Sequence, residues 1–232
     1  MKSVLEFYYS SIGKKVLMSL TGLFLITFLT EHLVGNLLLV MFNDNGATFE
    51  AYGYFLVHNP VVLAIEIFLF ASIAGHALLG GILWVSNRMK RPVKYNRFRL
   101  KDNATLSSRT MIWTGSIVFI FLVVHLRSFF MPLYPTRFNG NKISSYELVI
   151  QAFSNPWYVA FYLVALFILG YHLRHGFQSA FQTLGLRDKK YISLLDGLAF
   201  LIWFVIPLLY ATIPIICYVY RQPAINVIMG VH

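Results

Sequence analysis

The chain has 232 residues, of which 58% are hydrophobic, 17% aromatic and only 12% charged. A water-soluble domain needs more charge than this to cover its surface, so the composition excludes an ordinary soluble enzyme and indicates a membrane protein. The formal net charge of +10 does not indicate nucleic-acid binding, because the basic residues gather in loops between apolar segments.

Five apolar segments are each long enough to cross the roughly 30 Å hydrocarbon layer of a bilayer as a helix. Their approximate ranges are 15–42, 61–86, 110–131, 157–181 and 193–220. They lack the strict alternation that membrane β-strands show. Together they occupy most of the chain, which leaves no room for a separate soluble catalytic domain. We therefore predict an all-α integral membrane protein, a five-helix bundle that forms a single transmembrane domain over 1–232.

Basic residues are unevenly distributed between the loops of this bundle. Lys14 and Lys15 precede the first span, the second loop (87–109) carries eight Lys and Arg residues, and the fourth loop carries three. The first loop carries none and the third carries two. By the positive-inside rule, the N-terminus and the second and fourth loops lie in the cytoplasm and the C-terminus lies outside. The basic loops could bind anionic lipid headgroups or dock a cytoplasmic partner.

One histidine falls in each of the first four spans: His32, His76, His125 and His172. The first and third spans run outward and the second and fourth run inward. His32 and His125 therefore share an outer level, whereas His76 and His172 share an inner level. At about 1.5 Å of rise per residue, the two levels lie about 10–15 Å apart. A single membrane histidine is more often a packing residue or a proton relay, but four histidines at one per helix indicate a shared function.

Two neutral imidazoles on facing helices are the ligands of a bis-histidine haem, and helix bundles hold such groups in their cores. A zinc ion would need three or four ligands at one depth, including carboxylates or thiolates. Glycine-rich stretches such as "AGHALLGG" around His76 make room either for a flat macrocycle or for close helix packing. We predict two haems, the outer iron bound by His32 and His125 and the inner iron by His76 and His172.

Haem propionates are anionic and need donors at each level. At the inner level the candidates are Ser19, Arg109 and Trp113, together with Arg174 and His175, which follow the inner ligand by about one turn or less. Arg109 could instead be a positive-inside anchor. Arg174 could instead extend to the cytoplasmic headgroups.

Four segments occur in the order "SLTGLFLITFLTEHLVGN", "AGHALLGG", "VVHL" and "YHLRHGFQSAFQTLG" over the five spans. In this order they resemble the dihaem cytochrome b membrane anchor of succinate dehydrogenases and fumarate reductases, in its single-chain form with five helices. The resemblance covers essentially the whole chain. It implies that His76 and His172 are the proximal haem ligands and that His32 and His125 are the distal ones, in agreement with the pairing by depth.

The resemblance also implies partners and a location. A flavoprotein subunit with FAD and an iron–sulfur subunit would dock on the cytoplasmic face of a bacterial cytoplasmic membrane. The chain would pass electrons between the iron–sulfur clusters and a quinone, expected to be menaquinone. Assembly of whole complexes into higher oligomers is left open, as is the direction of the reaction between succinate and fumarate.

The resemblance places quinone chemistry near the distal haem, where a carboxylate exchanges protons. Our first candidate is Glu66 in the second span, followed by Glu31 beside His32 and by Glu50 and His58 in the preceding loop. Some fumarate reductases of this family have a membrane glutamate two residues before the fourth-helix ligand. Gly170 stands at that position here, which leaves a proton route through that site in doubt.

Two other functions are compatible with the same residues. The chain could be the cytochrome b subunit of another respiratory enzyme, such as a formate dehydrogenase or a hydrogenase. It could also be a proton-coupled transporter that uses its histidines as relays, which would bind no chromophore and would often show internal repeats.

Overall fold

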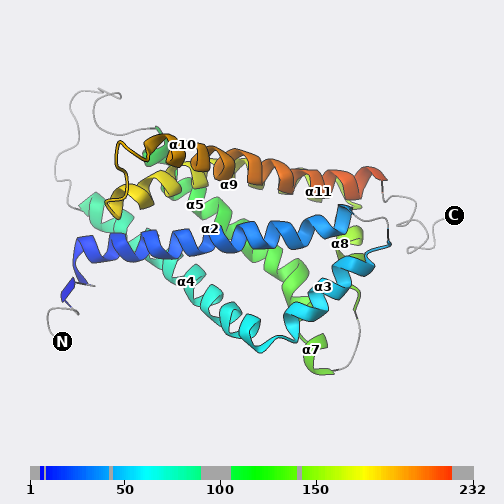
Figure 1. The fold of residues 1–232 in the computed structure, drawn as a ribbon. Helices are drawn as coiled ribbons and strands as arrows, with labels where there is room; N and C mark the ends of the chain where they lie inside the picture. The colour runs from blue at the N-terminus through cyan, green and yellow to red at the C-terminus, as the bar shows by residue number, and fades with distance from the viewer. Residues whose placement is uncertain (1–5, 8, 42–43, 90–105, 140–142, 221–232) are drawn as a thin grey trace.

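The computed structural model describes residues 6–7, 9–41, 44–89, 106–139 and 143–220, and every regular element in these ranges is helical (Figure 1). Five helical segments are long and apolar enough to cross a membrane. They are α2 (Ser11–Met41), α4 (Pro60–Met89), Thr110–Leu133, α9 (Pro156–Thr183) and Ile192–Val219. Each end lies within four residues of the predicted range, so the prediction of an all-helical multi-pass membrane protein is confirmed.

Two of the five spans contain a turn of π-helix. The third span consists of α5 (Leu106–His125), the π-turn η1 (Leu126–Phe130) and α6 (Met131–Leu133). The fifth consists of α10 (Ile192–Phe200), the π-turn η2 (Leu201–Val205) and α11 (Ile206–Tyr220). Such turns occur often at functional sites, and η1 begins directly after one of the four span histidines.

Proline gives a physical reason for the π-turn in the fifth span. Pro207 has no N–H for the carbonyl of Trp203 four residues before it, and its ring would collide with that carbonyl in a regular α-helix. The hydrogen-bond ladder shifts instead to a spacing of five residues, as in the bond from the Ile206 N–H to the Leu201 carbonyl. The fifth span therefore keeps its helical path through a sequence that would otherwise kink.

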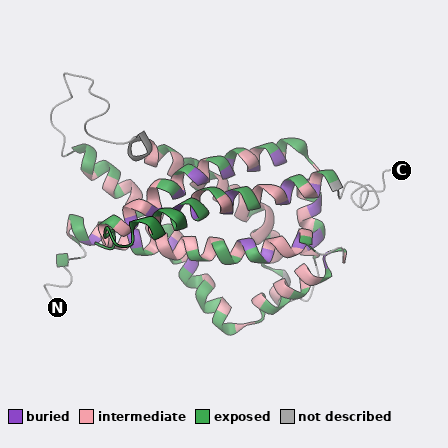
Figure 2. Cartoon of the chain, turned by 45° about the horizontal axis from the view of Figure 1, so that its top comes forward, coloured by how far each residue is buried: buried purple, intermediate pink, exposed green. Residues whose placement is uncertain are grey.

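Helix α9 is the centre of the bundle. It contacts α2, α5, α10, η2 and α11, while α2 also contacts α4 and α11. The helix begins at Pro156, where the side chain of Asn155 accepts a hydrogen bond from the Trp157 N–H, an arrangement that favours helix initiation. Figure 2 shows the buried residues concentrated along α2, α9 and α11. By contrast, α4 buries only Leu69 and Ser72 among its residues, so this helix lies at the edge of the core.

The two ends of the bundle differ in charge and in structure. One end holds the start of α2, the end of α4 and the turn between α9 and α10, with basic residues such as Lys14, Arg88 and Arg187 (Figure 1). The short helices α3 (Ala47–Val57), α7 (Thr136–Asn139) and α8 (Ser145–Ala152) lie at the opposite end. Most of the predicted second basic loop (90–105) lies outside the described residues.

Candidate metal centre

The four span histidines form two facing pairs. The ring centroids of His76 on α4 and His172 on α9 lie 6.3 Å apart, with ring planes at 75°. Those of His32 on α2 and His125 at the end of α5 lie 5.9 Å apart, with ring planes at 88°. Two imidazoles bound on opposite sides of one metal ion, each at about 2.0–2.1 Å, would have centroids roughly 6 Å apart. The spacing of each pair therefore suits a single metal ion between the two rings.

Three helices give the same separation between the two pairs. On α2, Gly22 contacts His76, and the outer histidine of that helix follows ten residues later. On α5, Gly115 contacts His172, and the outer histidine again follows ten residues later. On α9, Tyr162 contacts the outer His125, and the inner histidine follows ten residues later. Ten residues of α-helix span about 15 Å, so the two pairs lie at two distinct levels of the bundle.

His76 is held by a Thr–Gly dipeptide of α2. Thr21 Oγ1 lies 3.3 Å from His76 Nδ1. The same hydroxyl donates a hydrogen bond to the Leu17 carbonyl at 2.8 Å. A Cβ atom added to Gly22 would lie 3.2 Å from His76 Cε1, so the missing side chain allows the imidazole to approach α2 closely.

His172 is held in the same way by a second Thr–Gly dipeptide, on α5. Thr114 Oγ1 lies 3.5 Å from His172 Nδ1, a long contact, and donates to the Met111 carbonyl at 3.1 Å. A Cβ atom added to Gly115 would lie 3.3 Å from His172 Cε1. Each inner imidazole thus has a hydroxyl at Nδ1 and a glycine at Cε1, both from a neighbouring helix.

The outer pair has a different environment. His125 Nδ1 lies 3.0 Å from the Tyr162 hydroxyl, which lies 3.3 Å from the Tyr158 hydroxyl. His32 Nε2 lies 3.3 Å from Asn36 Nδ2, which donates a shorter bond of 2.7 Å to the His32 carbonyl. Aromatic side chains line this pair, with Phe28 stacked on His32 at 5.3 Å, and with Phe121 and Phe129 beside His125 at 5.8 and 5.3 Å.

This donor set fits bis-histidine haems better than a zinc site. In the described part of the chain, no group of three or more His, Cys, Asp or Glu side chains could hold a metal ion together. Each level supplies two imidazoles from two helices. The aromatic surroundings of the outer pair and the glycines beside the inner pair both suit a flat, largely apolar macrocycle.

Of the first three residues predicted to contact the inner haem propionates, one is buried, one is exposed, and the side chain of the third is not described. Ser19 is buried, and its hydroxyl donates to the Lys15 carbonyl at 2.9 Å. Trp113 is exposed on the surface of the bundle. The backbone of Arg109 belongs to α5, but its side chain lies outside the described residues.

The two candidates that follow His172 lie on α9. The Arg174 guanidinium lies over the Trp203 ring, with its Cζ atom 5.1 Å from the ring centroid. This cation–π contact directs Arg174 toward η2. His175 is half-buried one turn after His172, and it remains a candidate for supporting the inner level.

Each residue predicted for the quinone site has its own partner. Glu66 forms a bidentate ion pair with Arg137 of α7, at 2.9 and 3.1 Å, and both side chains are mostly shielded, at 20% and 16% exposed. The Arg137 guanidinium also lies over the rings of Phe130 and Tyr134, at 5.8 and 5.4 Å. The favoured carboxylate is therefore already engaged by a cation.

The other three candidates belong to or contact α3. Glu50 accepts hydrogen bonds from the Ser144 hydroxyl at 2.8 Å and from the Tyr146 N–H at 2.7 Å, which ties α3 to α8. Glu31 accepts a hydrogen bond of 2.5 Å from the Tyr52 hydroxyl. His58 is exposed and its Nδ1 lies 2.8 Å from the carbonyl of Tyr54.

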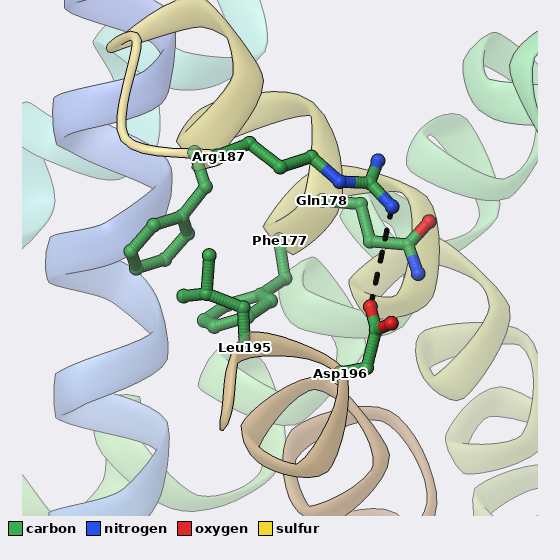
Figure 3. A pocket seen from close by; sticks show the side chains of 6 residues that line it. Phe177, Gln178, Arg187, Leu195 and Asp196 are labelled. Atoms are coloured by element: carbon green, nitrogen blue, oxygen red, sulfur yellow. Dashed lines mark ion pairs between the residues drawn. The ribbon is translucent and has the colours of Figure 1, made fainter. Parts of the chain in front are cut away.

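A small hollow lies at the opposite end, between the end of α9 and the start of α10 (Figure 3). It is lined by Phe177, Gln178, Phe181, Arg187, Leu195 and Asp196. Figure 3 shows Arg187 and Asp196 reaching toward each other across its rim, with Nη2 and Oδ1 4.0 Å apart. None of the four paired histidines belongs to its lining, so we assign it to the packing of this turn.

Sequence reasoning missed the residues that hold the imidazoles: Thr21, Thr114 and Tyr162. The two threonines carry a signal that could have been found, because the dipeptide Thr–Gly occurs twice in the chain. The glycine of each copy lies ten residues before an outer histidine. Tyr162 has no comparable signal in a span that is rich in aromatic residues.

Comparison with known proteins gives two matches. The sequence profile of the family described as "Succinate dehydrogenase/Fumarate reductase transmembrane subunit" matches residues 87–210. A "Succinate dehydrogenase hydrophobic membrane anchor subunit" from Thermoplasma acidophilum is 29% identical over 101 residues, which are 43% of this chain and 75% of that protein. No solved structure matches the chain.

Proposed function

Because the chain belongs to the transmembrane-subunit family of succinate dehydrogenases and fumarate reductases, we propose that it transfers electrons between an iron–sulfur subunit and a quinone. Two b-type haems would be bound, one between His76 and His172 and the other between His32 and His125. When bound, the haems supply one-electron redox chemistry at two levels of the membrane. The family membership supports this function over a formate dehydrogenase subunit, a hydrogenase subunit or a transporter.

One observation carries the proposal: the two facing histidine pairs about 15 Å apart along the helix axes. Each pair joins two different helices, so a group bound between the rings would also join those helices. The histidines would bind the iron, and the hydroxyls beside His76, His125 and His172 would orient those rings. The surrounding apolar side chains would exclude water from both levels.

The catalytic partners would be a flavoprotein with FAD and an iron–sulfur subunit. We place them at the basic end of the bundle, beside the inner pair. There Lys14 belongs to the start of α2, Arg88 to the end of α4 and Arg187 to the turn between α9 and α10, three segments that lie at the same end of the bundle (Figure 1). By the positive-inside rule this end is cytoplasmic. Such a surface would attract the acidic side chains of a docking partner, and it would also contact anionic lipids.

For the quinone, which we propose to be menaquinone, the hydrogen-bonded pair of Glu31 and Tyr52 is the best-supported proton-exchange group. Glu31 directly precedes the outer histidine His32, and its carboxylate accepts a hydrogen bond from the Tyr52 hydroxyl. Desolvation and the hydrogen bond to Glu31 raise the pKa of Tyr52 to about 12, so the phenol keeps its proton at neutral pH. A phenol beside a carboxylate can donate a proton to the quinone as it is reduced and accept one from the quinol as it is oxidised.

Purification of the intact complex in mild detergent tests this function. We expect a covalent or tightly bound flavin and iron–sulfur clusters to co-purify with the chain. We further expect succinate to reduce a b-type absorption band in the complex. A purified chain that shows no b-type band, or whose band succinate does not reduce in a complex with active flavoprotein, would contradict the proposal.

A further inference from the structure

We propose that Thr21 and Thr114 are positioning residues that fix the tautomer and orientation of the two inner histidines, so that both present Nε2 to the same iron. This inference rests on the proposed function, since it concerns how the chain prepares an inner haem site. It adds two residues that face the inner imidazoles from neighbouring helices. We call each Thr–Gly dipeptide, Thr21–Gly22 and Thr114–Gly115, a histidine seat.

Hydrogen-bond donors and acceptors determine the tautomer. A threonine hydroxyl has one proton and two acceptor lone pairs. The Thr21 hydroxyl donates to backbone carbonyls, those of Leu17 at 2.8 Å and Met18 at 3.1 Å, and the Thr114 hydroxyl donates to the Met111 carbonyl at 3.1 Å. With its proton on a backbone carbonyl, each hydroxyl accepts from the imidazole beside it. In this arrangement the Nδ1 atoms carry the ring protons, and the Nε2 lone pairs are free to bind a metal.

The glycines complete the two seats. With Cβ atoms at residues 22 and 115, the Cε1 atoms of His76 and His172 would lie at 3.2 and 3.3 Å, closer than ordinary van der Waals contact. Each imidazole would have to move away from its threonine by a few tenths of an ångström. A glycine after the threonine therefore allows the Nδ1 contact, and the 3.5 Å contact of Thr114 has little margin for such a shift.

Seats of the same kind on two different helices are difficult to attribute to packing alone. Thr27 on α2 makes the same backward hydrogen bond, to the Leu23 carbonyl at 3.1 Å, but it is exposed on the bundle surface. Thr21 and Thr114 share that backward bond and also face an imidazole. The outer pair uses a tyrosine hydroxyl at His125 instead. The two levels therefore give their histidines different hydrogen-bond partners.

The test compares Thr21→Val and Thr114→Val with Thr21→Ser, Thr114→Ser and the matched control Thr27→Val, all in the intact purified complex. Complex made in haem-limited cells is titrated with haemin, and the midpoint potential of each haem is measured by redox titration. Loss of a residue that hydrogen-bonds to a metal ligand typically weakens metal binding about 10–100-fold. We expect haem affinity at the inner level to fall by this factor in each valine variant, and haem affinity at the outer level to stay unchanged.

The potential gives a readout that packing alone would not produce. An Nδ1–H that donates to an acceptor makes the imidazole more basic and favours the oxidised iron. The valine variants should therefore raise the inner midpoint potential, whereas the serine variants should restore both potential and affinity. Thr27→Val should match the wild type in both measurements.

Three outcomes would overturn the inference. They are unchanged inner-haem affinity and potential in both valine variants, equal loss of both haems, and failure of serine to restore what valine removes. Should a valine variant fail to assemble, Thr→Ala at the same position and the variant of the other threonine give the same comparison. A wild-type complex without haem would instead contradict the proposed function itself.

Discussion

Gly170 supports a sharp prediction about how α9 packs against the fifth span. A Cβ atom added at this position would lie 2.7 Å from the backbone oxygen of Trp203 in η2. Even close C–H···O contacts have carbon–oxygen distances of about 3.3–3.6 Å. Gly170→Ala should therefore force α9 and η2 apart by about 0.6 Å or more. The opposing atom belongs to the backbone, so no side-chain rotation can relieve the contact.

The expected magnitude combines two opposing effects. Overpacking of this kind typically costs about 1–3 kcal/mol, whereas replacing a helical glycine by alanine gains about 1 kcal/mol of helix propensity. The difference between these two effects is a net loss of up to about 2 kcal/mol. For a chain of this size, that loss lowers the Tm by up to about 8 °C.

Thermal unfolding of the purified complex in detergent checks this prediction. The matched control is Gly197→Ala in α10, where an added Cβ atom would meet nothing within 4 Å. It should leave the Tm unchanged or raise it slightly. If Gly170→Ala unfolds at or above the temperature of Gly197→Ala, the close approach of α9 to η2 does not limit the packing, and our reasoning about Gly170 is wrong.

Three further predictions concern the other sites. His175→Ala should keep both haems in a spectrum of the purified complex, because the seats hold His172; loss of the inner haem would show that His175 is the ligand. Glu66→Gln should lower the Tm, because hydrogen bonds to charged groups contribute about 1.5–3 kcal/mol, and Glu66→Gln combined with Arg137→Gln should recover part of that loss. An unchanged Tm in Glu66→Gln would exclude the pair as a stabilising contact. Tyr52→Phe should slow quinone reduction in a steady-state assay while succinate still reduces the haems at the wild-type rate; an unaffected quinone rate would remove Tyr52 from the quinone site.

The sequence was sufficient for the spans and for the arrangement of the histidines. The bilayer allows almost no alternative to a helix for a long apolar segment, so the five ranges could be read directly. Alternating span direction then placed His32 near His125 and His76 near His172. The structure brings the same residues together. Their separation follows from helix rise alone.

The carboxylates could not be interpreted from the sequence because their partners are set by tertiary structure. Glu66 was our first candidate for proton exchange because it stands in an apolar span. Its partner Arg137 lies 71 residues later, on the short helix α7 beyond the third span. Tyr52 likewise reaches Glu31 only because α3 folds back against α2. No periodicity of the sequence encodes either contact.

The histidine seats are a third case. The sequence contains both Thr–Gly dipeptides, but nothing beside them in the sequence indicates that each contacts a histidine. A Thr–Gly dipeptide in a membrane helix usually indicates close helix packing. Only the neighbouring helix shows that an imidazole occupies the space. Gly170 is similar, because the carbonyl that approaches it depends on Pro207 and the π-turn of another span.

The most direct test of the account is the number of haems in the purified complex and its single-histidine variants. We predict two b-type haems per chain by the pyridine haemochrome assay. His76→Ala and His172→Ala should each lose the same one, and His32→Ala and His125→Ala should each lose the other. A wild-type complex with fewer than two haems, or a pair whose two variants lose different haems, would contradict the central claim that two histidine pairs bind two haems.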